Sequence, residues 1–261
     1  MRLALTAAFL LIAGPALAQE TGNPLQPSET WDIDLRESVL GLEAEPPIDP
    51  SILDLSAPVR ADDAALVPLR LTQPDGAPAL EAATVVIDQN PAPVAAEFQL
   101  GKAMAPLDME IRVRVDAYSD VRVIGNPDGD APVMAGRFIK ASGGCSAPAG
   151  KDMAAVAETM GDMRWKTAVE GDRNIGTLMI RHPNFSGLQR DQVTLLTIPA
   201  HFIDTLEVRQ GDEMLFTMSA GISISEDPVF RFAYTPNGQP ISVHAEDTDG
   251  NVWDQTFDAA G

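Results

Sequence analysis

Ile111-Arg112-Val113-Arg114-Val115 is the stretch of sequence that decides the fold. Its apolar and charged residues alternate with a period of two, which is typical of a strand that buries one face and exposes the other. Further segments of the first half also favour strands, at 68–71, 83–88, 94–100, 118–124 and 136–140. Turn sequences separate them, namely Asp75-Gly76, Asn90-Pro91 and Asp128-Gly129.

The second half repeats this style. Its candidate strands lie at 176–181, 193–199, 203–209, 213–218, 229–234, 241–246 and 251–257. Asp249-Gly250, between the last two, predicts a hairpin. Short, regularly spaced strands in two blocks, without recurring crossover helices, predict an all-β protein built from two antiparallel β-sandwiches.

Two short helices are expected beside the strands. Within 29–42, apolar residues recur every four positions, at Trp31, Leu35 and Val39. In the middle of the chain, a second apolar stripe has spacings of three and four, at Met153, Val156, Met160 and Met163. Both patterns predict the packing face of a helix.

The chain is predicted to have four segments. Residues 1–18 have the pattern of a signal peptide, because Arg2 and an apolar run precede the small-residue site Ala16-Leu17-Ala18. A β-sandwich domain over 19–140, a linker with a short helix over 141–170 and a second sandwich over 171–261 then follow. No later stretch approaches the roughly 20 apolar residues of a membrane span. We therefore expect an exported, soluble protein in the periplasm.

The charge balance bears on the partners. With 38 acidic and 18 basic side chains, the formal net charge is −20. Nucleic acid is excluded as a partner, because its binding depends on Lys and Arg contacts to phosphate. Basic surfaces of other proteins would be attracted instead.

Cys145 is the only cysteine of the chain, and it lies among small residues, in Ala141-Ser142-Gly143-Gly144-Cys145-Ser146-Ala147-Pro148-Ala149-Gly150. An unpaired cysteine in an oxidising compartment indicates intermolecular bonding or a free reactive thiol. Its small neighbours offer little to bury it, so we expect an exposed thiol on a flexible strip with a pKa near 8.5. Gly143 and Gly144 are the expected hinge, since glycine leaves the backbone unrestricted.

The sequence does not predict a metal site. A copper or zinc site would have to combine Cys145 with His182, His201 or His244, and no histidine follows the cysteine at a ligand spacing. These histidines are interpreted as hydrogen-bonded residues of a sandwich. Residues 247–251 resemble a calcium loop only superficially, because their glycine is at the wrong position.

A mobile thiol on a compact body is suited to a carrier that holds an intermediate while partner enzymes do the chemistry. Two alternatives remain. One is a Cys-dependent enzyme, which would need a base within hydrogen-bond reach of Cys145. The other is a non-catalytic adaptor, in which Cys145 would be dispensable.

The motifs of the chain resemble those of the SoxYZ sulfur carriers of periplasmic thiosulfate oxidation, with both subunits in one chain. Residues 29–145 are similar to SoxY in Ala57-Pro58, Val67-Pro68-Leu69, Asp88-Gln89-Asn90-Pro91-Ala92-Pro93, Arg112-Val113-Arg114 and Gly143-Gly144-Cys145. Residues 175–257 are similar to SoxZ in Ile180-Arg181-His182-Pro183, Ser186-Gly187, Ile198-Pro199-Ala200-His201-Phe202-Ile203, Ile222-Ser223-Ile224-Ser225, Asp227-Pro228 and Asp247-Thr248-Asp249-Gly250.

This resemblance implies an Ig-like sandwich in each half and no catalytic activity or cofactor of the chain's own. Cys145 would be the covalent attachment site for sulfur intermediates, with Gly143 and Gly144 as the hinge. The implied partners are periplasmic sulfur-oxidation enzymes and c-type cytochromes. SoxY normally ends soon after its cysteine, whereas here a second domain follows and tethers the arm at both ends. In this respect the chain resembles SoxYZ-like carriers associated with quinoprotein alcohol dehydrogenases, which implies partners linked to those enzymes as well.

Overall fold

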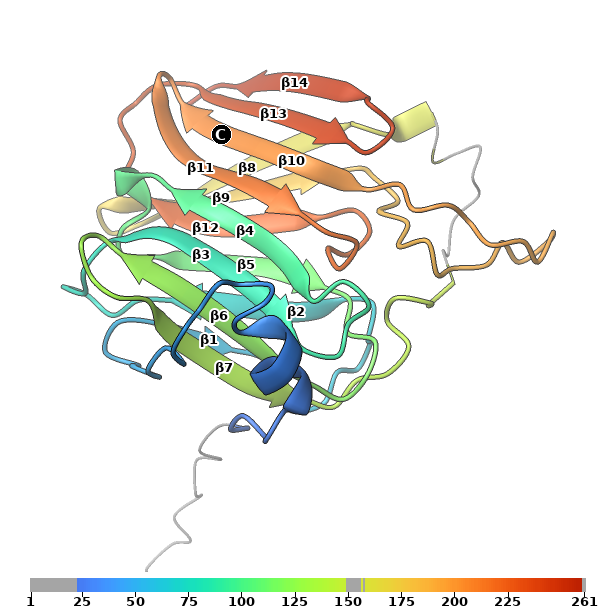
Figure 1. Ribbon diagram of the computed structural model, residues 1–261. Helices are drawn as coiled ribbons and strands as arrows, with labels where there is room; N and C mark the ends of the chain where they lie inside the picture. Colours follow the sequence, from blue (N-terminus) through green and yellow to red (C-terminus); the bar gives the residue numbers. More distant parts are fainter. Residues whose placement is uncertain (1–22, 149–155, 157, 260–261) are drawn as a thin grey trace, which may run out of the picture.

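The computed structural model describes residues 23–148, 156 and 158–259 (Figure 1). The described chain is nearly all β and forms two antiparallel sheets, which confirms the predicted fold class. The expected leader at 1–18 lies outside the described residues. Within the described part, no helix has both the length and the apolar character needed to cross a membrane.

Within the described residues, each half contributes seven strands. Those of the first half are β1 (Asp54–Ser56), β2 (Val67–Thr72), β3 (Leu80–Ile87), β4 (Val94–Leu100), β5 (Asp108–Val113), β6 (Ser119–Pro127) and β7 (Val133–Ile139). Those of the second half are β8 (Met163–Glu170), β9 (Arg173–Ile180), β10 (Ile203–Gln210), β11 (Glu213–Ala220), β12 (Val229–Tyr234), β13 (Ile241–Asp247) and β14 (Val252–Phe257). The first half also has a short π-helix, η1 (Thr30–Leu35), and a 3₁₀ turn, η2 (Lys102–Met104).

Both sheets run continuously from one half into the other. The larger sheet has the order β14-β13-β10-β11-β4-β3-β6-β7, and the smaller one β1-β2-β5-β12-β9-β8. Figure 1 shows β4 of the first half beside β11 of the second, and their register runs from Phe216↔Leu100 to Ala220↔Ala96. In the smaller sheet, β5 pairs with β12 through Met109↔Phe232. One hydrophobic cluster fills the space between the sheets across both halves, so the two sandwiches share a core.

The η1 helix covers the outer face of the larger sheet in the first half. Trp31 and Leu35 are buried there against Val86, Ile124 and Met134. Val39 does not continue this face: it is 53% exposed, because the helix ends at Leu35 and the chain turns away.

Two further expectations require correction. Residues 193–199 form no strand but part of an exposed loop between β9 and β10, with Val193 90% exposed. In the segment predicted as the middle helix, Val156, Glu158 and Thr159 are helical, whereas Met163 already begins β8; Met153 lies outside the described residues. Strand β8 thus occupies the end of the range 141–170 that was assigned to the linker.

Candidate functional site

Cys145 lies in a turn that the first half holds through its backbone. The carbonyls of Asp116 and Val115 accept hydrogen bonds from the N–H groups of Gly143 (2.7 Å) and Gly144 (3.1 Å). The carboxylate of Asp116 accepts a third bond from the N–H of Cys145, at 3.2 Å. Asp116 therefore fixes the position of the cysteine.

Asn90, from the Asp88–Pro93 motif, orders the residues that hold this turn. Its side-chain oxygen accepts from the N–H of Asp116 at 2.8 Å, and its amide group donates to the carbonyl of Arg114 at 2.7 Å. The same amide group donates to the hydroxyl of Ser223, in the second half, at 2.8 Å. Asn90 is buried, so it acts as an internal link between the two halves beneath the Cys145 turn.

The second half closes over the turn with the segment that follows β9. The hydroxyl of Ser186 donates to the carbonyl of Cys145, and the side-chain amide of Gln189 donates to the carbonyl of Ala147 at 3.0 Å. Gln189 also accepts from the N–H of Ser186 at 3.1 Å, which joins the two contacts. We call Ser186 and Gln189 the clamp.

The burial of Cys145 contradicts the expectation of an exposed thiol. Cys145 is 0% exposed. Burial, followed by the nearby negative charge of Asp116, raises the pKa of the Cys145 thiol to about 11, although Arg114 acts in the opposite direction. The sequence argument failed because the side chains and backbone that cover Cys145 come from distant segments, not from its small neighbours.

Gly143 and Gly144 have structural tasks in this closed arrangement. Gly143 has a φ of +76°, a backbone angle that residues other than glycine adopt only at a cost in free energy. A Cβ on Gly144 would lie 2.1 Å from the carbonyl oxygen of Ala64. Gly144 is therefore packed directly against backbone, and the hinge role of Gly143 and Gly144 stays a prediction.

Arg114 is a site residue that the sequence analysis missed. The alternation of 111–115 places it on the exposed face, yet it is 1% exposed because β5 ends at Val113 and the chain turns inward. Its guanidinium donates to the carbonyls of Gly144 and Asn184, both at 3.3 Å, while its Nε has no hydrogen-bond partner within the described residues. Burial lowers the pKa of Arg114. A buried cation thus lies beside the Cys145 turn.

No histidine forms a hydrogen bond with the Cys145 thiol in the described part of the chain. The hydrogen bonds described for Cys145 are made by its backbone N–H and carbonyl groups. His182 and His201 instead meet at Asp247, with Nε2···Oδ2 distances of 3.3 and 2.6 Å. Burial is the main cause that lowers the pKa of His182. Burial alone would raise the pKa of Asp247, but hydrogen bonds from Asn251 and His201 hold it well below its usual range. His244 lies elsewhere, between Asp254 and Glu246, which raise its pKa.

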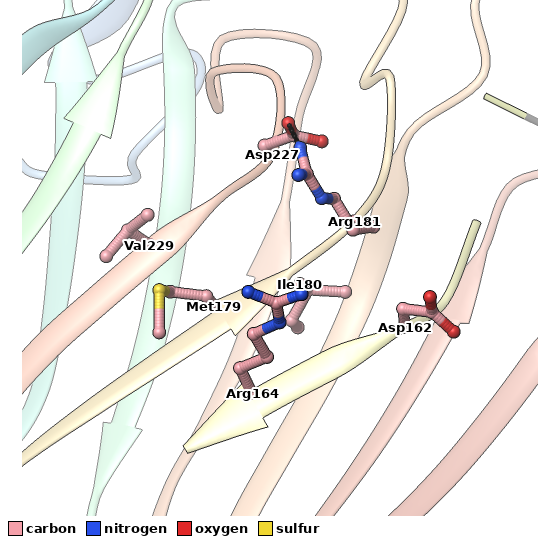
Figure 2. A pocket seen from close by; sticks show the side chains of 7 residues that line it. All are labelled: Asp162, Arg164, Met179, Ile180, Arg181, Asp227 and Val229. Atoms are coloured by element: carbon pink, nitrogen blue, oxygen red, sulfur yellow. Dashed lines mark hydrogen bonds and ion pairs between the residues drawn. The ribbon is translucent and has the colours of Figure 1, made fainter. Parts of the chain in front are cut away.

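A surface pocket of about 220 Å³ opens beside β8, β9 and the start of β12 (Figure 2). Figure 2 shows the guanidinium of Arg181 directed toward Asp227, and these groups are 2.6 Å apart. The lining residues are Asp162, Arg164, Met179, Ile180, Arg181, Asp227 and Val229. Cys145 is not among them, so the thiol does not open into this pocket in the closed arrangement.

Comparisons with known proteins give two family matches in consecutive parts of the chain. The model described as "Sulfur oxidation protein SoxY" matches residues 37–145, and that described as "Sulphur oxidation protein SoxZ" matches residues 163–258. No curated protein matches the chain. Among solved structures, a β-glucuronidase from Parabacteroides merdae aligns with 79% of this chain at 9% identity and a TM-score of 0.24, and the chain spans 24% of its length.

Proposed function

The chain belongs to the SoxY and SoxZ families of sulfur oxidation proteins, fused in one polypeptide, and on this premise we propose that it carries a sulfur intermediate covalently on Cys145. Proteins of these families are carriers rather than catalysts. The observation that carries the proposal is that the SoxY match ends at Cys145, the one thiol of the chain, where both halves meet. The absence of a hydrogen-bonded base at the thiol, among the described residues, argues for a partner that supplies the chemistry.

Loading of the carrier would be an oxidation. A bond forms between Cys145 Sγ and a sulfur atom of the cargo. The S–H bond of Cys145 is lost, and a protonated cargo loses its S–H bond as well. Two electrons leave with the released protons, and a c-type cytochrome partner is the proposed acceptor. Unloading then needs a second partner that cleaves or hydrolyses the adduct, because the carrier offers no base of its own at the thiol.

Access to Cys145 would require opening of the clamp. A thiol with a pKa of about 11 is almost entirely protonated at neutral pH, and thiolate is the reactive form. Release of the bonds from Ser186 and Gln189 would expose the turn while the bonds to Asp116 still hold its base. The closed arrangement would thus protect the thiol, and the partner would select the open one.

The periplasm is the proposed location, on the pattern of residues 1–18. The proposed partners are sulfur-oxidation enzymes, cytochromes and quinoprotein dehydrogenase-linked enzymes that present basic surfaces. The net charge of −20 would steer such surfaces toward the carrier.

The proposal is tested by replacing Cys145 with serine in the producing cell and measuring oxidation of reduced sulfur compounds. We expect Cys145→Ser to abolish the pathway while the variant accumulates as a folded protein. Ser146→Cys in the Cys145→Ser background is a matched control that returns a thiol one residue away. Full pathway activity in the Cys145→Ser strain would contradict the proposal and show that the protein is an adaptor. Turnover of substrate by the purified protein alone would show that it is an enzyme.

A further inference from the structure

His182, His201 and Asp247 meet at one end of the sandwich. His182 follows β9 of the smaller sheet, whereas His201 precedes β10 and Asp247 ends β13, both in the larger sheet. One ligand atom from each lies within 4.8 Å of the others. The backbones of Phe185 and His201 also pair here, so the convergence is built into the fold.

One neutral tautomer of His182 directs a lone pair at a carboxylate. His182 Nδ1 lies 2.7 Å from Asn184 Oδ1, which already accepts from the N–H of Ile203, and 3.1 Å from the backbone nitrogen of Asn184, which can donate to it. In the tautomer whose Nδ1 proton is donated to Asn184 Oδ1, the other nitrogen, Nε2, carries a lone pair. That lone pair faces Asp247 Oδ2 at 3.3 Å, and two acceptors at this distance are suited to share a cation.

One of the three ligand separations already has the value of a tetrahedral transition-metal site. With bonds of 2.0–2.2 Å, two ligands of tetrahedral zinc lie roughly 3.3 Å apart. The His182–Asp247 pair already has this separation. His201 Nε2 is closer to Asp247 Oδ2, at 2.6 Å. The His201 side chain is 17% exposed, so it has room to move away from Asp247 until the two ligand atoms are roughly 3.3 Å apart.

Outer contacts would hold each ligand in place, as in known metal centres. Asn184 backs His182, and its own amide is fixed by the carbonyl of Ser225 at 2.9 Å. Asn251 donates to Asp247 through both its backbone and side chain. Asp249 Oδ2 lies 3.7 Å from His201 Nδ1, beyond hydrogen-bond distance, and would have to move closer to hold this ring.

We propose that His182, His201 and Asp247 form a binding site for a divalent transition metal, with Zn²⁺ as the best match. Two imidazoles and one carboxylate are a common zinc ligand set, and the fourth position would be open on the exposed side of His201. The site lies in the same segment as the clamp, since His182 and Asn184 directly precede Ser186. Bound metal would therefore stiffen the segment that covers Cys145.

The test is calorimetric titration of the purified, metal-stripped full chain, without a histidine tag, with ZnCl₂. We expect one Zn²⁺ per chain, and at least a 100-fold loss of affinity in both His201→Gln and Asp247→Asn. His244→Gln is the matched control, because His244 also contacts two carboxylates but lies outside the cluster; it should bind as the unchanged protein does. Titration with Co²⁺ should add the visible absorption of a tetrahedral ion, lost in His201→Gln.

Three results would overturn the inference. They are no stoichiometric binding, binding that persists in His201→Gln and Asp247→Asn, and binding that disappears in Cys145→Ser, which would make the thiol a ligand. Circular dichroism of each variant separates loss of a ligand from loss of the fold, and His201→Gln is the decisive variant because its side chain is partly exposed.

Discussion

Burial governs the chemistry of Cys145. A pKa of about 11 leaves on the order of one thiolate per ten thousand thiols at pH 7, which is about two orders of magnitude below an unburied cysteine. In the proposed carrier, this suppression would keep the thiol from adventitious oxidants until a partner opened the clamp.

The first prediction concerns thiol reactivity. We expect iodoacetamide to alkylate native protein at pH 8 about 100-fold more slowly than the urea-unfolded chain. The native rate should still rise above pH 10, since the thiolate forms only there, whereas the unfolded rate should level off above about pH 9. Ser186→Ala combined with Gln189→Ala should accelerate alkylation by at least about tenfold, because each clamp bond contributes roughly 1 kcal/mol.

Gln192→Ala is the matched control, since among the described residues that amide bonds only to the carbonyl of Arg190 in its own loop. Equal rates for native and unfolded protein would mean that the clamp does not protect the thiol.

The second prediction separates the two glycines by thermal unfolding. Gly144→Ala should cost about 3 kcal/mol or more, because its Cβ would meet the carbonyl of Ala64 at 2.1 Å. Gly143→Ala should cost only about 1 kcal/mol, from its positive φ. Gly129→Ala is the control, with a φ of +75° and nothing within 4 Å, and should match Gly143→Ala. An unchanged melting temperature for Gly144→Ala would restore the free-hinge interpretation.

Among the elements, β4 and β11 are paired strands that connect the two halves in the larger sheet. Phe98 on β4 packs edge-on against Phe216 on β11, with ring centroids 6.0 Å apart. Phe216 also contacts Phe232 on β12 of the opposite sheet at 5.1 Å. These rings connect both sheets and both halves.

The third prediction is that Phe216→Ala destabilises the protein by about 3–5 kcal/mol, since it leaves a large cavity at a fully buried position. Phe216→Leu should recover more than half of this loss in chemical denaturation. Phe257→Ala, in edge strand β14, should cost markedly less because Phe257 is only partly buried. Similar losses for both alanine variants would argue against a central joint.

The sequence predicted most strands because alternation and turn residues are local properties. It failed at 193–199, which joins neither sheet and leaves Val193, Leu195 and Leu196 exposed. It also failed at Arg114, because the strand ends two residues before the alternation does. The Cys145 site was beyond local reasoning: Asn90, Asp116 and Ser186 meet only through the fold. Asp247 was assigned to a hairpin, correctly, but its contacts with His182 and His201 depend on the packing of two sheets.

At the scale of the whole molecule, the halves share both sheets and one core. This arrangement differs from two bodies on a flexible connection, although each family match covers only one half. A partner that binds either half therefore contacts a body that includes the Cys145 turn.

The fourth prediction is a single cooperative thermal transition for the full chain, with equal calorimetric and van't Hoff enthalpies. Continuous pairing between β4 and β11 and between β5 and β12 couples the halves, so neither should melt alone. Differential scanning calorimetry checks this; two resolved transitions would show that the shared sheets contribute little to stability.

Covalent carriage is tested most directly by the intact mass of the protein purified without reductant from cells that are oxidising reduced sulfur compounds. We predict a mass increase of one or more sulfur atoms, with or without oxygen, that dithiothreitol removes and that peptide analysis places on Cys145. Protein from cells that lack the pathway should be free thiol or a Cys145-linked dimer. An unmodified thiol in cells with full pathway flux would contradict the account.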